Sequence, residues 1–277
     1  MQAVLGAISQ LGMSVLLSVA SLGRFTQFAG STFRWFTQVR KWCRWRLLAP
    51  QFYAVGVQSV LVVAITGAFI GMILAIEMYD QFRTIGQEGK LGGVINISVV
   101  KQIGPVLAAV MVAGRVGGAL AAELGTMRVT EQLDAMRAMA ADPIAYLVVP
   151  RVVACVVMTP LLTIYSDMLG VWGAWLITVR LHGVSVFEYW EFTSQFVDWW
   201  EPTSGLIKSV FFGLSIGLIS CYKGFNCSAG ASGVGRAATE AFVASFLAII
   251  AINLVLAQFL NTVNYIFITR GDAAGFV

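Results

Sequence analysis

The stretch LLAPQFYAVGVQSVLVVAITGAFIGMILAI, residues 47–76, contains no charged side chain. A second uncharged stretch, AFVASFLAIIAINLVLAQFLNTVNYIFIT, covers residues 241–269. A helix needs about 20 apolar residues to cross the hydrocarbon core of a bilayer, so each stretch is long enough to span it. In a soluble protein of 277 residues, both stretches would have to be buried on every side. The chain is therefore predicted to be an all-α integral membrane protein.

The overall composition supports a membrane protein without a large soluble domain. Hydrophobic residues make up 58% of the chain and charged residues 12%, about half the charged share of ordinary soluble domains. Six of the eighteen basic residues lie within residues 24–46, beside the first apolar stretch. There they favour the cytoplasmic face and anionic lipid, so the net charge of +4 does not indicate a nucleic-acid partner.

Residues that usually hold metals or act as nucleophiles are sparse. The four cysteines, Cys43, Cys155, Cys221 and Cys227, form no CxxC pair, and His182 is the only histidine. We therefore expect free thiols, no metal site and no catalytic residue. The chain also lacks a glycine-rich phosphate loop ending in Lys-Ser or Lys-Thr, so it should hold no nucleotide cofactor and should not hydrolyse ATP itself.

Hydropathy divides the chain into an amino-terminal region, residues 1–50, and a membrane domain, residues 51–277. Five spans are predicted in the membrane domain, at residues 52–76, 97–122, 146–177, 204–222 and 241–268. Polar connections are expected at 77–90, 126–143 and 223–236. The connection at 180–202 combines tryptophans with acidic residues, which is typical of a membrane interface. Pro50 is expected to separate the amino-terminal region from the first span.

The amino-terminal region is interpreted as a helix that lies in the membrane interface. On one side of a helix with 3.6 residues per turn fall the apolar residues Phe25, Phe28, Phe36 and Val39. On the opposite side fall the polar residues Gln27, Arg34 and Gln38. Such a helix favours an orientation along the membrane surface. The alternative is a first spanning helix with a basic flank, and whether residues 3–22 cross the bilayer stays open.

The distribution of basic residues orients the spans. If the amino terminus is cytoplasmic, the segments on that side hold Arg24, Arg34, Arg40, Lys41, Arg44, Arg46, Arg128, Arg137, Arg151, Lys223 and Arg236. The segments on the opposite side hold Arg83, Lys90, Arg180 and Arg270. This excess agrees with the positive-inside bias, so we expect the amino terminus in the cytoplasm and the carboxyl terminus outside.

The second span carries charges that hydrocarbon does not tolerate without a partner. Lys101, Arg115 and Glu123 fall on one side of an uninterrupted helix. Charges at bilayer depth cost about 3 kcal/mol or more each unless they face protein or water. One interpretation places all three along a polar cavity, and the other leaves only Arg115 buried while its neighbours reach the two membrane surfaces. The same span permits close helix packing through Gly114, Gly117 and Gly118.

The predicted connection at 126–143 contains a short amphipathic helix. Thr130 is expected to cap it, Glu131 to lie in its first turn, and Pro143 to end it. An apolar stripe at a spacing of three is formed by Leu133, Met136 and Met139. A helix of this kind is typical of a docking element for a cytoplasmic partner, and the alternative is a helix lying flat on its own membrane domain.

Several stretches resemble one known family. The sequence GPVLAA at 104–109, followed by AGRVGGALAAELGTMRVTEQLDAMRAMAADPIAYLVVPR at 113–151, is similar to the MlaE/YrbE family of ABC-transporter permeases. TGAFIGMILA at 66–75, LIKSVFFG at 206–213 and the SAG and GVGRAATEA segments within 228–241 add to the resemblance. It covers about residues 50–262, and the TEQLDAMR and DP segments are its most specific part.

The resemblance implies a homodimeric permease that moves phospholipids or related lipids and catalyses no reaction itself. It implies a separate cytoplasmic ATPase that binds ATP and Mg²⁺, an extracytoplasmic MCE-domain protein and, in some systems, a STAS-domain protein. It also implies a place in the bacterial inner membrane, with an amino-terminal elbow helix before five spans. It leaves open the lipid species and the direction of transport.

The resemblance also implies that the helix at 130–141 is the coupling helix seated in the ATPase. Its contact residues would be Thr130, Glu131, Gln132, Leu133, Asp134, Met136 and Arg137. The hypothesis for this contact places Glu131 and Arg137 around an apolar centre of Leu133 and Met136.

Charged and polar residues of the spans are the candidates to line a lipid cavity between two permeases. They are Lys101, Gln102, Arg115, Lys208 and Glu77. A different function, an ion channel or secondary transporter, would instead use Lys101, Arg115, Glu123 and Asp167 as a relay inside the membrane.

Overall fold

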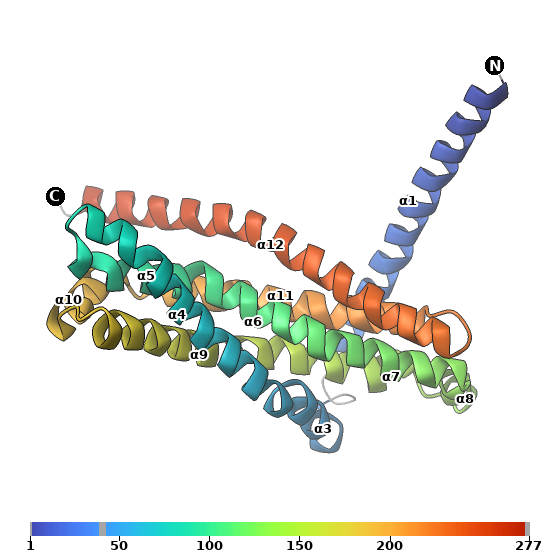
Figure 1. The fold of residues 1–277 in the computed structure, drawn as a ribbon. Helices are drawn as coiled ribbons and strands as arrows, with labels where there is room; N and C mark the ends of the chain where they lie inside the picture. The colour runs from blue at the N-terminus through green and yellow to red at the C-terminus, as the bar shows by residue number, and fades with distance from the viewer. Residues whose placement is uncertain (1, 39–42, 275–277) are drawn as a thin grey trace.

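The structure is a computed structural model that describes residues 2–38 and 43–274, and the side chains of residues 19–38 and 43–266. Val39, Arg40 and Lys41, which were assigned to the amino-terminal helix and to the basic segment, lie outside the described residues. All regular structure within the described residues is helical, and no strand occurs among them (Figure 1).

The helices of the described chain confirm the predicted fold class. Helix α1 (Gln2–Phe36) comes first. Five helical segments that follow are long and apolar enough to cross a membrane: Trp45–Thr84, Glu88–Val129, Ile144–Leu181, Trp200–Phe225 and Ala231–Ile266. Because hydropathy marks the apolar part of a helix rather than its first backbone hydrogen bond, each segment begins before its predicted span.

The first segment is made of α3 (Trp45–Val55), a 3-10 turn η1 (Val57–Ser59) and α4 (Val60–Thr84). The expectation that Pro50 breaks the chain is wrong, because Pro50 lies inside α3 and the helix continues past it. The break occurs at Gly56 instead, where a Cβ atom would lie 1.8 Å from Cε of Met158. The α4 helix continues to Thr84, so Glu77, Asp80 and Arg83 lie on its last turns and not in a loop.

The second segment begins with a short 3-10 turn η2 (Glu88–Lys90) and is interrupted twice by π turns. In order it contains α5 (Leu91–Ser98), η3 (Val99–Ile103), α6 (Gly104–Val112), η4 (Ala113–Gly117) and α7 (Gly118–Val129). The turns η3 and η4 are π-helical. A π turn bonds residue i to i+5 and so rotates all later side chains relative to earlier ones. The prediction that Lys101, Arg115 and Glu123 share one side is therefore wrong, since it assumed a continuous α-helix.

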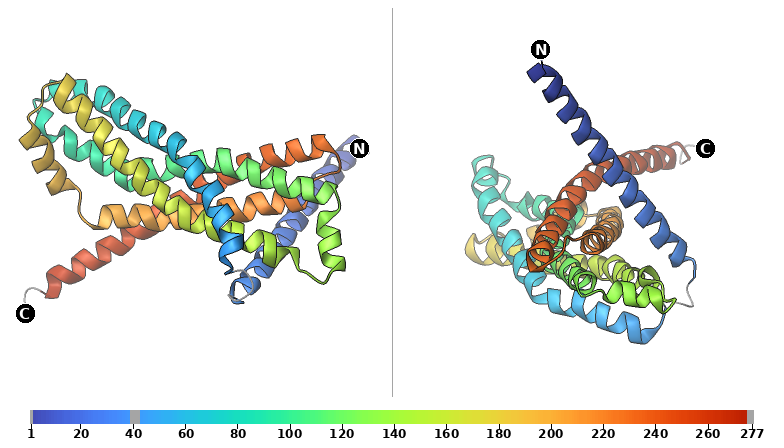
Figure 2. Two further views of the ribbon diagram at one scale, coloured as in Figure 1. Left: turned by 90° about the horizontal axis from the view of Figure 1, so that it is seen from below. Right: turned by 90° about the vertical axis from the view of Figure 1, so that its right-hand side faces the viewer.

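The remaining segments complete the bundle. They are α8 (Gln132–Ala138), η5 (Ile144–Val148), α9 (Val149–Trp175), η6 (Leu176–Leu181), α10 (Val186–Phe196), α11 (Trp200–Phe225) and α12 (Ala231–Ala274). The long helices run lengthwise through the molecule (Figures 1 and 2). Helix α8 and the α11–α12 connection lie at one end of the bundle, and α10 and the α4–α5 connection lie at the other. The predicted loop at 223–236 is shorter than expected, because α12 already begins at Ala231.

Helices α4 and α9 pack closely against each other, and glycines make this contact possible. A Cβ atom at Gly71 would lie 1.9 Å from the carbonyl oxygen of Gly170. One turn earlier, a Cβ atom at Gly67 would lie 2.6 Å from the carbonyl oxygen of Ser166. Since lipid supplies little hydrophobic drive between helices, such close backbone contact gives the dispersion energy that holds them together.

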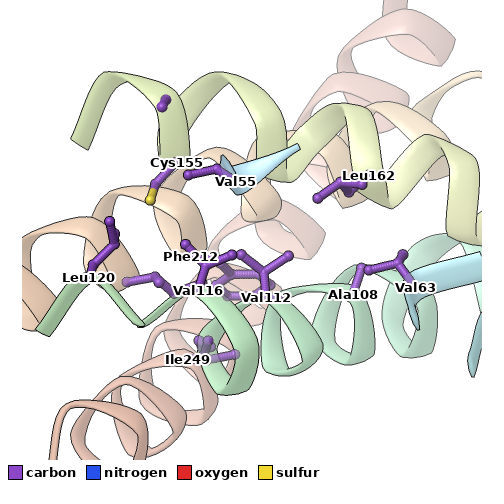
Figure 3. Close-up of a cluster of buried hydrophobic side chains, with 14 residues drawn as sticks. Val55, Val63, Ala108, Val112, Val116, Leu120, Cys155, Leu162, Phe212 and Ile249 are labelled. Carbon is purple, nitrogen blue, oxygen red and sulfur yellow. The ribbon is translucent and has the colours of Figure 1, made fainter. Parts of the chain in front are cut away.

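All five segments contribute to one central apolar core (Figure 3). Its buried members include Val55, Val63, Val112, Val116, Cys155, Phe212 and Ile249. The core therefore fixes the second segment between the first, third, fourth and fifth segments.

Helix α10 packs against α5 through a buried hydrogen-bond network. The Tyr189 hydroxyl donates to Oδ1 of Asn96 at 3.0 Å, and Nδ2 of Asn96 donates to the Thr193 hydroxyl at 2.9 Å. Tyr189 and Asn96 are both fully buried. Burial raises the pKa of Tyr189 to about 12, so the phenol stays protonated and remains a donor at neutral pH.

Helix α1 leaves the bundle at an angle (Figures 1 and 2). Its aromatic residues pack against the last turns of α11. The rings of Phe25 and Phe28 contact the Tyr222 ring edge-on, with centroid distances of 5.3 and 5.6 Å. Gln27, Arg34 and Gln38 are exposed, as expected for the polar side. The stripe therefore anchors α1 to the end of α11 as well as giving it an amphipathic shape.

We predict that Gly71→Ala lowers the free energy of unfolding by about 1–3 kcal/mol, because the new methyl group overlaps the α9 backbone. The measurement is unfolding of the purified protein in mixed micelles with increasing SDS. Gly23→Ala in α1 is the matched control, since no atom lies within 4 Å of its Cβ position; there alanine should stabilise the helix by about 0.5–1 kcal/mol. Equal stability of the two variants would contradict the α4–α9 contact.

Candidate functional sites

Helix α8 begins later than the sequence indicates. Thr130 ends α7, and its hydroxyl donates to the Thr126 carbonyl at 2.8 Å, so the expectation that it caps the next helix is wrong. Glu131 follows with φ of 59°, and α8 starts at Gln132. The chain turns sharply between α7 and α8 at Glu131, whose left-handed backbone differs from the extended conformation of a usual capping residue.

The end of α8 also differs from the expectation. The helix ends at Ala138, and Ala140 adopts a left-handed conformation with φ of 59°. Pro143 does not end α8 but precedes η5, where its fixed φ suits the first turn of a helix. The Ile144 amide donates to Oδ1 of Asp142 at 2.9 Å, so Asp142 and Pro143 together begin the third segment.

The two sides of α8 have different surroundings. Leu133 is buried against the membrane domain, where it packs in a cluster with Leu124, Val148 and Phe225. The hypothesis that Leu133 forms the centre of a docking surface is therefore wrong. The exposed residues of the helix and its flanks include Thr130, Glu131, Gln132, Asp134, Arg137 and Met139, with Met136 half-buried. Arg137 and Asp134 form an ion pair at 2.8 Å on this exposed side.

Polar contacts tie the helices around α8 to one another. The Arg151 guanidinium on α9 pairs with Glu123 on α7, with Nη2 and Oε1 2.8 Å apart, and also donates to the Leu147 carbonyl at 2.8 Å. Arg151 is buried, whereas the Glu123 side chain is about half-exposed. Arg128, near the end of α7, donates to the Phe225 carbonyl at the end of α11. These contacts make α7, α9 and α11 one unit at the α8 end.

A second group of polar residues lies between the second segment and the start of α11. Lys101 forms an ion pair with Glu201, with Nζ and Oε2 3.0 Å apart. Nζ of Lys208 donates to Oε1 of Gln102 at 2.7 Å and to the Lys101 carbonyl at 3.0 Å. Lys208 is buried, while the Lys101 side chain is 29% exposed. We call Lys101, Gln102, Glu201 and Lys208 the lysine cluster.

The backbone explains why a lysine is buried here. Pro105 has no N–H, so the Lys101 carbonyl lacks the donor that a continuous helix would provide. The ammonium group of Lys208 donates to this carbonyl. Gly205, one turn earlier on α11, lets the two helices approach, because a Cβ atom there would lie 2.6 Å from the Val100 carbonyl oxygen. The lysine cluster is thus built on the irregular turn η3.

The other charged candidates lie apart from the lysine cluster. Arg115 hydrogen-bonds to residues at the break between α3 and α4. Glu77 is exposed on α4 and has no ion pair among the described residues. Asp167 on α9 lies against Gly104, and its Oδ1 has no hydrogen-bond partner within the described chain. With Lys101 and Glu123 held by other partners, these groups do not form a continuous relay in the described structure.

The three glycines of the second segment contact two different helices. A Cβ atom at Gly117 would lie 3.0 Å from the Ser220 hydroxyl of α11. At Gly114 and Gly118 it would lie 3.5 Å from the Phe242 ring and 3.8 Å from the Ala238 carbonyl oxygen, both on α12. These small residues therefore let α11 and α12 pack on neighbouring sides of the segment.

Two partners of the candidate charges were not singled out from the sequence. Glu201 was assigned to an interfacial connection, although it precedes Lys208 by seven residues and so lies on the same side of α11. Arg151 was counted only as a basic residue on one side of the membrane. The spacing of Glu201 and Lys208 on α11 could have indicated Glu201 as a partner of the lysines. Arg151 and Glu123 lie on two different segments, so no local sequence pattern indicated that pair.

Comparison with known proteins gives one consistent result. Residues 48–259 match the family described as Permease MlaE. A Rickettsia bellii protein named probable ABC transporter permease protein is 36% identical over 255 residues, covering 92% of this chain and 98% of the relative. The Haemophilus influenzae intermembrane phospholipid transport system permease protein MlaE is 34% identical, covering 91% and 97%. The Arabidopsis thaliana protein TRIGALACTOSYLDIACYLGLYCEROL 1, chloroplastic, is 36% identical, covering 78% and 61%.

Removing one member of the Arg151–Glu123 pair should affect the free energy of unfolding differently from removing the other. Glu123→Gln leaves a buried guanidinium without its counter-charge, whereas Arg151→Met leaves a carboxylate that water can solvate. We expect Glu123→Gln to cost about 1–3 kcal/mol of unfolding free energy. Adding Glu123→Gln to Arg151→Met should cost little more than Arg151→Met alone.

SDS unfolding of the single and double variants measures this asymmetry. Glu191→Gln on the exposed side of α10 is the control and should change stability by less than about 0.5 kcal/mol. Additive effects of the two single substitutions would show that the pair is not coupled.

Proposed function

Because the chain belongs to the MlaE family of ABC-transporter permeases, we propose that it is the membrane subunit of a transporter that moves phospholipids. It is a multi-pass membrane protein, and in this proposal a separate ATPase supplies the energy. The observation that carries the proposal is α8, a short exposed helix held between two membrane segments. The printed name of the Haemophilus relative, intermembrane phospholipid transport, supports phospholipid as the transported class.

In the proposed mechanism, α8 is the coupling helix of the transporter. Its exposed residues Glu131, Gln132, Asp134 and Arg137, with Thr130 at the preceding turn, contact the ATPase, while Leu133 and Met136 support the helix from its own side. ATP binding by the partner displaces α8, and the helices tied to α8 move with it. The Arg151–Glu123 pair and the Arg128–Phe225 contact carry this displacement into α7, α9 and α11.

The proposed assembly contains two copies of this chain, an ATPase, an MCE-domain protein and, in some systems, a STAS-domain protein. The α8 end faces the cytoplasm, which places α10 and the carboxyl terminus on the other side of the bacterial inner membrane. The basic residues near the α8 end support this orientation. The half of α12 farthest from α8 exposes Leu254, Val255 and Phe259, an apolar surface that suits lipid or a second copy.

We place the contact with lipid headgroups at the lysine cluster. Two ammonium groups against the single carboxylate of Glu201 leave one net positive charge, which complements a phosphate. Lys101 is the partly exposed member and is the residue proposed to meet the phosphate, with Lys208 donating to its backbone carbonyl and to the Gln102 side chain. Arg115 and Glu77 remain candidates for the same cavity only if a second copy brings them close to the cluster.

The coupling assignment predicts that Glu131→Lys abolishes lipid-stimulated ATPase activity of the purified complex. Charge reversal on the exposed side of α8 replaces an attraction for the ATPase by a repulsion. Membrane insertion and SDS resistance should stay unchanged, since Glu131 is exposed. Glu191→Lys at the opposite end of the bundle is the control and should leave the ATPase stimulated. Full stimulation in Glu131→Lys would remove α8 from the coupling role.

The lysine cluster predicts a charge-dependent rate of lipid transfer. Lys101→Gln should slow transfer of anionic phospholipid by about tenfold or more, because a charge-assisted hydrogen bond is worth about 1.5–3 kcal/mol. Lys101→Arg keeps the charge and the pairing with Glu201, so it should retain most activity. The assay is ATP-dependent transfer of fluorescent phospholipid from liposomes containing the whole complex. Equal rates for the two variants would place headgroup recognition elsewhere.

A further inference from the structure

The first membrane segment is bent where α3 meets α4. Gly56 stands at the bend, and its missing Cβ leaves room for Met158 of α9. A 3-10 turn of three residues, η1, then leads into α4. A bend in a membrane helix interrupts the ladder of backbone hydrogen bonds, and inside a bilayer the freed groups must be satisfied by protein.

Arg115 provides hydrogen bonds on both sides of this bend. Its Nη1 donates to the Ala54 carbonyl at 3.3 Å and to the Ser59 hydroxyl at 2.8 Å. Its Nη2 donates to Oε1 of Gln58 at 2.9 Å. Ala54 belongs to α3, whereas Gln58 and Ser59 belong to η1. One guanidinium group therefore joins the end of α3 to the turn that follows it.

The chemistry of this contact is specific to arginine. All three acceptors are neutral, and no acidic residue forms an ion pair with Arg115 among the described residues. The planar guanidinium presents several N–H groups in a fixed fork, which can reach three acceptors at once. A lysine ammonium at this position is a point charge on a flexible chain and cannot reproduce that geometry.

Arg115 also connects the bend to the helices that lead to α8. It belongs to the π turn η4, which continues directly into α7 and then to α8. Around it, Val55 at the end of α3 and Val112 and Val116 of the second segment pack in the same core cluster (Figure 3). A displacement of α7 therefore reaches α3 through both the guanidinium contact and apolar packing.

We propose that Arg115 is a positioning residue that fixes the angle between α3 and α4 and makes α3 follow the second membrane segment. Loss of Arg115 frees the bend at Gly56, and α3 then samples several angles relative to α4. This role goes beyond the proposed function, because it concerns the internal geometry of the chain whatever lipid is moved.

The test is a distance measurement between spin labels on the two helices. Trp45 at the start of α3 and Phe69 on α4 are both exposed, so each can be replaced by a labelled cysteine after the four native cysteines are changed to alanine. Helix α3 is about 16 Å long at 1.5 Å per residue, so a tilt of about 20° moves the Trp45 label by about 5 Å.

Arg115→Gln should broaden the label distance distribution or shift its mean by about this amount, and Arg115→Lys should give an intermediate result. Arg180→Gln, a charge removal at the opposite end of the bundle, is the control and should leave the distribution unchanged. An unchanged distribution in a folded Arg115→Gln protein would overturn the proposal.

A second variant tests the same contact from the other side. Gln58→Ala combined with Ser59→Ala removes two of the three acceptors and keeps Arg115. It should reproduce the broadening, and it decides the question if Arg115→Gln does not fold. Because the distance is measured without ATP or partner proteins, its result is independent of whether the complex transports phospholipid.

Discussion

The main constraint on this structure is that backbone groups inside a bilayer must find partners within the protein. Where the helices are regular, the backbone meets this requirement alone. At Pro105 and at Gly56 the helices are irregular, and side chains from elsewhere supply the missing hydrogen bonds. Lys208 donates to the Lys101 carbonyl beside Pro105, and Arg115 donates to the Ala54 carbonyl beside Gly56. Two cations of the membrane segments, the buried Lys208 and the partly buried Arg115, thus have a structural role before any role in transport.

Close packing is the second requirement, because lipid chains are as apolar as the helix surfaces they cover. Glycines at Gly67 and Gly71 bring α4 against α9, and Gly205 brings α11 against the turn η3. The approach at Gly205 keeps the polar groups of the lysine cluster within hydrogen-bond distance. The absence of a side chain at Gly205 therefore allows close helix packing and also allows Lys208 to reach its polar partners. Packing and electrostatics depend on each other at this site.

At the α8 end of the molecule a short helix is held against a large group of helices. Helix α8 has seven residues, too few to be stable alone, and Leu133 anchors it in a core shared with α1, α9 and α11. Its opposite side remains exposed, and its neighbours are joined by the Arg151–Glu123 pair. In the proposed mechanism, a partner that displaces α8 would therefore act on helices that are already joined to one another.

The sequence by itself determined the all-α class, the five spans and the exposed helix near residue 133, because uncharged length and helical spacing are local properties. Local rules failed at Pro50, Thr130 and Pro143, where the directions of neighbouring helices decide the backbone. The partners of Lys101, Arg115 and Glu123 were settled only by the tertiary structure. Two π turns rotate these side chains apart, and their contacts lie on other segments, as in the Arg115–Ser59 bond across 56 residues.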